Sequence, residues 1–141
     1  MNRPVGLVVM EACGSAHHWA QWLGGLGIVV NLLPARCAEI VPVQVKSVGQ
    51  QALQSLHRTR SLWMATRTRR IRALRGFCRE FGIAVAQGSR LGVEQIGRVL
   101  ADPQSAIPGL LRGTMRLLVE EIRLLEGRIA QVERELTAAA R

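Results

Sequence analysis

A regular spacing of apolar residues near the C-terminus constrains the fold of this chain more than any other feature of its sequence. These residues lie alternately four and three positions apart: Leu111, Met115, Leu118, Ile122, Leu125, Ile129, Val132 and Leu136. Such an a/d heptad repeat is typical of a long helix with one apolar seam. Charged residues of both signs fill the positions between, as expected for solvated flanks. The pattern predicts that this helix pairs with the basic helix at 47–81, with a second copy of the chain, or with both, so these eight residues are candidate oligomerisation residues.

The segment at 47–81 is strongly basic. It holds eight arginines and one acid, Glu80, and so carries +7 of the formal net charge of +9. It contains no proline and has a broken apolar stripe from Val48 to Phe81, which predicts a long amphipathic helix. Its arginines are Arg58, Arg60, Arg67, Arg69, Arg70, Arg72, Arg75 and Arg79.

These arginines could form a face of the helix that is simply solvated, or they could contact nucleic acid. A solvated helix face usually alternates in charge sign, whereas no acid stands between Glu39 and Glu80. Self-repulsion would then go uncompensated unless a polyanion supplied the opposite charge. The pattern therefore favours contact with nucleic acid, mainly through phosphates, and the eight arginines are candidate nucleic-acid-binding residues.

The N-terminal part has a different character. Val5–Met10 is an apolar run rich in valine, as in a strand buried on both faces, and 28–33 is a second such run. Between them, Ser15 can cap a helix that runs to about Leu23, and the GGLG stretch suits a left-handed helix end. The order strand, helix, strand predicts a parallel α/β unit, which two strands alone leave incomplete.

These patterns together predict an α+β chain that is mostly α-helical. Residues 1–46 would form the partial α/β domain. Residues 47–141 would form a helical region, with the basic helix, a short helix from Val93 to Leu100 ended by Asp102–Pro103, and the heptad helix.

Glu11, at the carboxyl end of the first predicted strand, is the candidate catalytic residue. Ligands of open α/β sheets gather at the carboxyl ends of the strands, and a carboxylate there is commonly one of several that hold Mg²⁺. The alternative is a carboxylate that is simply exposed. His17 and His18 are adjacent on a helix and point about 100° apart, so both cannot face one ion. One surface and one half-buried histidine are expected instead.

Cysteine usage and hydropathy indicate a soluble cytoplasmic protein. The cysteines Cys13, Cys37 and Cys78 are odd in number and widely spaced, which favours neither a disulfide framework nor a zinc site. The longest apolar run, Leu23–Pro34, is too short to cross a bilayer. No membrane partner is expected.

The sequence resembles a known family in several segments. VVMEACGSAHHWAQWL is similar to the segment around the catalytic Glu in the IS-one-hundred-ten family of insertion-sequence transposases, which are related to the Piv invertases. VPVQVKSVGQQALQSLHRTR and IRALRGFCREFGIAVAQG resemble the later segments of that family, in the same order. The resemblance implies an RNase H-like (RuvC-like) domain joined to a helical coiled coil, and a C-terminal domain with a serine nucleophile. It also implies DNA and a structured guide RNA as partners, and action as a homo-oligomer.

The chain departs from this family in its acidic residues. The family's metal site uses one Glu and three Asp with Mg²⁺, and only Glu11 has a counterpart here. The first Asp would precede Met1, and the other two would lie in a helix that looks deleted near Val41. The serine domain would lie beyond Arg141. We therefore expect a truncated, internally deleted transposase that binds no metal by itself and is catalytically inactive.

Three functions remain open at this point. The first is a transposase of this family, the second is a nucleic-acid-binding helical module, and the third is a coiled-coil interaction protein without enzymatic activity.

Overall fold

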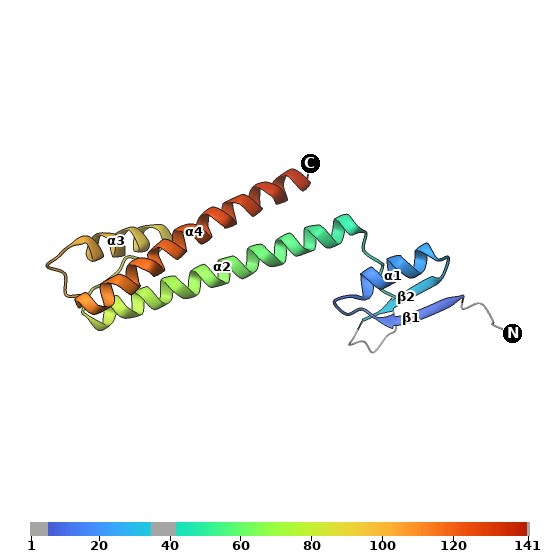
Figure 1. Cartoon of the computed structure of the whole chain (residues 1–141), viewed down its shortest axis with the longest axis horizontal. Helices are drawn as coiled ribbons and strands as arrows, with labels where there is room; N and C mark the ends of the chain where they lie inside the picture. The colour runs from blue at the N-terminus through green and yellow to red at the C-terminus, as the bar shows by residue number, and fades with distance from the viewer. Residues whose placement is uncertain (1–5, 35–41, 141) are drawn as a thin grey trace. The chain divides into compact units, whose positions relative to one another are not determined.

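The computed structural model describes residues 6–34 and 42–140, and the chain divides into two compact units, Met1–Gln54 and Ser55–Arg141. The sequence placed the boundary after residue 46, within the first of these units. The elements, labelled in Figure 1, are β1 (Leu7–Glu11), α1 (Ala16–Gly25), β2 (Val29–Leu33), α2 (Val48–Glu80), α3 (Ser89–Ala101) and α4 (Gly109–Ala139). The predicted α+β class, mostly helical, is confirmed.

The first unit is a small parallel α/β layer. β1 and β2 pair in parallel, with Leu7 opposite Val29 and Glu11 opposite Leu33. α1 covers one face of this sheet, where Ala16, Ala20 and Leu32 are buried together. The predicted strand, helix, strand order is therefore confirmed.

Burial of both strand faces was predicted wrongly. Leu7, Val9 and Val29 are 53%, 54% and 59% exposed. The reason is that, within the described residues, α1 is the element that packs on β2, while the second face of the two-stranded sheet has no covering layer. Ser15 is at the predicted N-cap of α1, but its side chain makes no capping hydrogen bond. The α1 end is as predicted, since Gly27 has a φ of 79° and donates to the Gly24 carbonyl.

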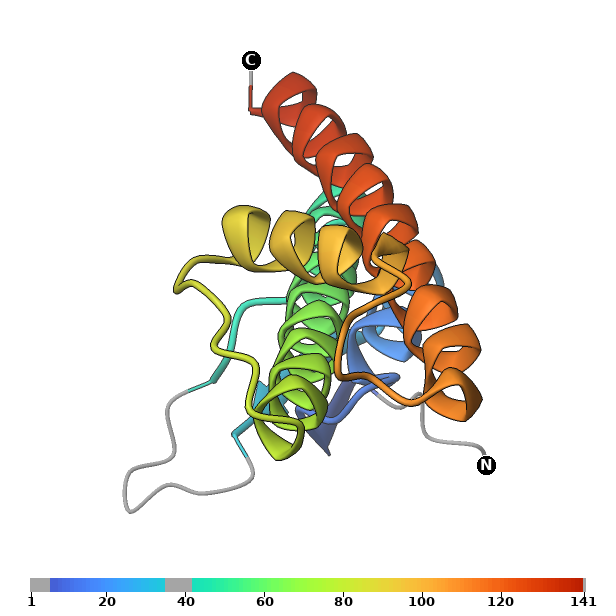
Figure 2. The ribbon, with the colours of Figure 1, turned by 90° about the vertical axis from the view of Figure 1, so that its left-hand side faces the viewer.

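The second unit is built on two long helices that run antiparallel. Arg60 in the first half of α2 pairs with Glu133 near the end of α4, and Arg70 farther along α2 pairs with Glu121 farther back in α4, so the two helices run in opposite directions. In Figure 1 the two helices lie side by side, and Figure 2 shows α3 crossing over them.

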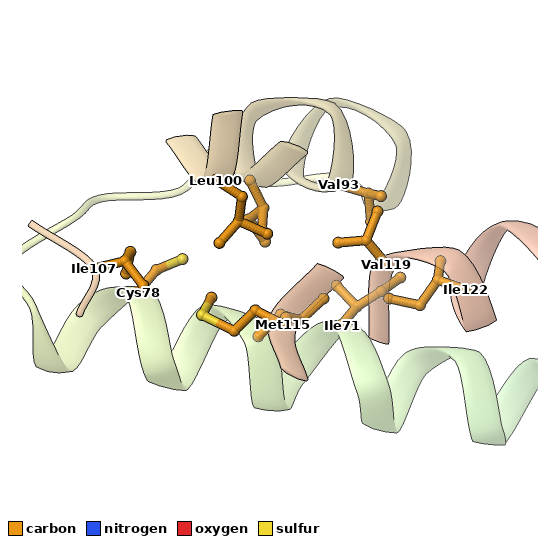
Figure 3. Close-up of a cluster of buried hydrophobic side chains, with 10 residues drawn as sticks. Ile71, Cys78, Val93, Leu100, Ile107, Met115, Val119 and Ile122 are labelled. Atoms are coloured by element: carbon orange, nitrogen blue, oxygen red, sulfur yellow. The ribbon is translucent and has the colours of Figure 1, made fainter. Parts of the chain in front are cut away.

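The core of this unit lies where the three helices meet. Ile71, Leu74 and Cys78 of α2 pack against Met115, Val119 and Ile122 of α4, and α3 closes the core. Figure 3 shows side chains of all three helices converging. Five seam residues (Met115, Ile122, Leu125, Ile129, Val132) are buried, and Leu111, Leu118 and Leu136 are half-buried. A helix of the same chain therefore covers the heptad seam.

Two contributors to this unit carried no recognised signal in the sequence. Val119 is buried although it lies off the a/d repeat, at a position that core-facing helices of globular proteins often use as well. Arg112 donates hydrogen bonds to the carbonyls of Asp102, Pro103, Ser105 and Ile107 and so holds the α3–α4 connection closed.

Candidate nucleic-acid interface

The eight candidate arginines of α2 do not form one surface, because half of them are placed toward the rest of the helical unit. Arg60 donates to Glu133 through Nε and Nη2, at 2.9 and 2.7 Å, and Arg70 donates through Nε to Glu121. Two acids of α4 thus supply countercharge to α2. The expectation that no residue of the chain would compensate the basic helix was wrong for these two arginines, because the acids come from a helix distant in sequence.

Arg75 and Arg67 also face inward. Arg75 donates through Nη2 to the carbonyls of Ala86 and Gly88, at 2.9 and 2.8 Å, and so fastens the loop before α3. Arg67 is half-buried, and its Nε is enclosed without a hydrogen-bond partner in the described residues. Neither side chain is presented freely to an external ligand.

The remaining four arginines form a surface that we call the outer face of α2: Arg58, Arg69, Arg72 and Arg79. All four are exposed, and no ion pair is recorded for them in the part of the chain that the structure describes. Arg58, Arg72 and Arg79 are separated by multiples of seven residues, which places them on one side of a helix, and Arg69 lies three residues before Arg72. The outer face extends for about 30 Å, given a rise of about 1.5 Å per residue.

The outer face lies away from the core of the helical unit. Ile71, Leu74 and Cys78, the buried residues of α2, lie on the opposite side of the helix. Ala65 and Gly76 lie on the outer face between the arginines, and so does Leu62, which is 63% exposed. A rigid, cationic strip can lie along a polyanion, and arginine can bind phosphate oxygens in a bidentate way.

Glu11 and the histidines do not converge on a site. Glu11 is exposed at the end of β1, where the sequence placed it. His17 is half-buried and its Nδ1 accepts a hydrogen bond from the Lys46 backbone N–H at 3.2 Å, while His18 is exposed against Trp19. One half-buried and one surface histidine were predicted, and this is confirmed. Within residues 6–34 and 42–140, no three His, Cys, Asp or Glu side chains gather closely enough to hold a metal ion.

The two described cysteines differ in their environments. The pKa of exposed Cys13, two residues after Glu11, is lowered by hydrogen bonds from the backbone and hydroxyl of Ser15. Burial raises the pKa of the Cys78 thiol in the helical core. Cys37, and the deletion inferred near Val41, lie outside the described residues. Among the described helices, none has the length and apolar character needed to cross a membrane.

The chain is similar in sequence to several known proteins. The chain is 36% identical to a Pseudomonas aeruginosa protein named "Probable family 20 transposase", over 98% of this chain and 48% of that protein. It is also 29% identical to the transposase for insertion sequence element IS1111A of Coxiella burnetii, over 97% of this chain and 44% of that protein. The chain is a homologue of insertion-sequence transposases. It matches no protein-family model and no solved structure.

The extent of these alignments is informative about the transposase homologue. The chain spans about half the length of the curated relatives it matches. The aligned stretches are 163 and 161 residues long although the chain has 141 residues, so both relatives contain residues that have no counterpart here.

Proposed function

We propose that this transposase homologue is a DNA-binding protein of insertion-sequence origin that contacts phosphates through the outer face of α2 and does not cleave DNA by itself. The observation that carries the proposal is the sorting of the arginines. Arg60 and Arg70 form ion pairs with acids of α4, whereas the four outer-face arginines form none within the described residues. Mutual repulsion of four aligned cations is relieved when a polyanion lies along them.

The finer relationship to the IS-one-hundred-ten family is part of the proposal. A Glu at the carboxyl end of β1, in a parallel strand, helix, strand unit, is consistent with a fragment of an RNase H-like domain. The family resemblance would make a structured guide RNA a second ligand of the same arginines. The contrasting function, a helical interaction protein with no nucleic-acid role, is supported by the inward placement of Arg60, Arg67, Arg70 and Arg75.

Salt dependence is the experiment that tests binding. Each phosphate neutralised on duplex DNA contributes a slope of about −0.9 to log K against log salt concentration. Four outer-face contacts therefore predict a slope of roughly −3.6, or roughly a 100-fold weaker affinity at 200 mM than at 50 mM salt. Fluorescence anisotropy with a labelled duplex measures this slope, and a structured RNA competitor tests the guide-RNA expectation. Absence of binding at the lower salt concentration would leave the interaction-protein function.

Catalysis is expected to be absent. The described residues around Glu11 do not fit the Mg²⁺ site of the family, because that ion commonly needs more than one carboxylate or a substrate phosphate beside it. The purified chain with Mg²⁺ or Mn²⁺ should neither nick nor join element-end DNA, and Glu11→Ala should change nothing in a gel assay. Metal-dependent cleavage that Glu11→Ala abolishes would contradict the proposal that this chain does not cleave DNA by itself.

A further inference from the structure

A cavity, which we call the α2–α3 cavity, lies at the end of α2 where the chain turns toward α3. The loop between these two helices is visible in Figure 2. The cavity has a volume of about 350 Å³ and is lined by Arg75, Arg79, Gly82, Ile83, Ala84 and Val85. Small-ligand sites commonly have volumes of about 300–1,000 Å³ and combine an apolar lining with a few polar groups. The α2–α3 cavity is at the lower end of that range, so it suits a ligand of the size of one aromatic ring system.

Three residues hold the loop side of this cavity in place. Arg75 donates through Nη2 to the Ala86 carbonyl at 2.9 Å. Gln95 of α3 accepts a hydrogen bond from the Ala86 N–H at 2.8 Å and donates one to the Ala84 carbonyl at 2.9 Å. Gly92 leaves the room that Arg75 needs, because a Cβ at that position would come within 2.8 Å of Arg75 Nη2. The cavity is therefore preformed, and a ligand would not have to order the loop when it binds.

The lining has a cationic part and an apolar part, and none of its described residues is acidic. Arg75 and Arg79 supply the charge, and Arg79 is exposed and forms no recorded ion pair in the described part of the chain. Ile83, Ala84 and Val85 supply the apolar wall. A planar guanidinium group binds phosphate oxygens and also stacks on aromatic rings. A nucleotide, which joins a phosphate to a flat aromatic base, therefore matches both parts of the lining.

Arg79 belongs both to this cavity and to the outer face of α2, so a phosphate backbone that follows the outer face reaches the cavity at its last arginine. In a continuous duplex every base is paired and stacked, and none can enter. An unpaired base can leave the stack, and proteins commonly hold such bases against apolar side chains and guanidinium planes. We propose that the α2–α3 cavity receives one unpaired nucleobase of the nucleic acid that lies along the outer face. This inference rests on the phosphate contacts proposed for that face.

Fluorescence anisotropy of the full chain at low salt, with three labelled DNA probes, tests the cavity. The first probe is an uninterrupted duplex, the second has one unpaired nucleotide bulged from one strand, and the third has an abasic site at that bulged position. The chain should bind the second probe roughly 10-fold more tightly than the third, because only the second offers a base to stack. The third probe controls for the easier bending of bulged DNA. Equal affinity for the second and third probes would overturn the inference and leave the outer-face contacts standing, whereas failure to bind any of the three would refute both.

Two variants of the loop test where the base is held. Ala84→Leu adds apolar volume at a residue that lines the cavity, so the preference for the second probe over the third should disappear. Affinity for the uninterrupted duplex should stay that of the wild type, because the outer-face arginines are unchanged. Ala86→Leu is the matched control, since it makes the same change at an exposed residue of the same loop that does not line the cavity, and it should keep the preference. Circular dichroism checks that both variants retain the wild-type helix content. A preference that persists in Ala84→Leu, or that both variants lose equally, would overturn the assignment of the base to this cavity.

Discussion

Ile122→Asp is expected to unfold the helical unit. Ile122 has no exposed surface and lies in the core against residues of α2. Removing a buried isoleucine side chain costs about 2–5 kcal/mol, and an unpaired carboxylate in its place adds several more. A domain of ordinary stability has about 5–15 kcal/mol in total, so one substitution consumes most of it. Adding Ile129→Asp, at a second buried seam position, should leave no folded population.

Circular dichroism with thermal melting measures this loss. Leu91→Asp is the matched control, because it places the same acid at an apolar residue of α3 that is 63% exposed. It should retain the helix content and nearly the full melting temperature. Ile122→Val, which removes a single methylene group, should lower stability by only about 0.5–1.5 kcal/mol. A well-folded Ile122→Asp chain would mean that α4 does not use the heptad seam against α2.

The long helices could be predicted from sequence because their signals are local. The heptad spacing of 111–136 and the proline-free stripe of 48–81 each lie within one segment, and α4 and α2 form there. The basic helix was one of two predicted partners of the seam, but the heptad pattern could not decide between it and a second chain, because the same spacing suits both. The place of α3 in the core likewise depends on how distant segments fold together, which the periodicity of a short helix does not record.

In the N-terminal unit, local sequence patterns predicted the strands but not how they are covered. Valine-rich runs correctly predicted β1 and β2, because β-branched residues favour strands. They could not indicate how many layers cover the sheet, and Leu7, Val9 and Val29 remain exposed. Similarly, all eight arginines of α2 were predicted to contact nucleic acid, whereas Arg60 and Arg70 pair with acids 73 and 51 positions away. Contacts over such separations leave no mark in the local pattern.

Replacing the outer-face arginines should remove most of the salt-dependent binding to DNA. In the variant Arg58→Gln, Arg69→Gln, Arg72→Gln and Arg79→Gln, four phosphate contacts are lost. The slope of log K against log salt should flatten by up to roughly 3.6, and affinity at low salt should fall by orders of magnitude. Helix content should not change, because glutamine is a good helix former and these side chains make no recorded ion pairs in the described residues.

Arg60 and Arg70, the two arginines of α2 that form ion pairs with α4, provide the control for these substitutions. Arg60→Gln with Arg70→Gln removes two charges from the same helix, but these charges already have partners in Glu133 and Glu121. The salt slope of this variant should differ from that of the wild type by no more than about 0.9, the value for one phosphate contact. Its stability should change little, because exposed ion pairs contribute only about 0–1 kcal/mol each. If the loss of binding affinity per removed charge were the same in this variant as in the outer-face variant, binding would depend on net charge alone. Unchanged binding in the outer variant would show that the outer face is merely solvated, since its four arginines are the ones that the fold leaves available to a phosphate backbone.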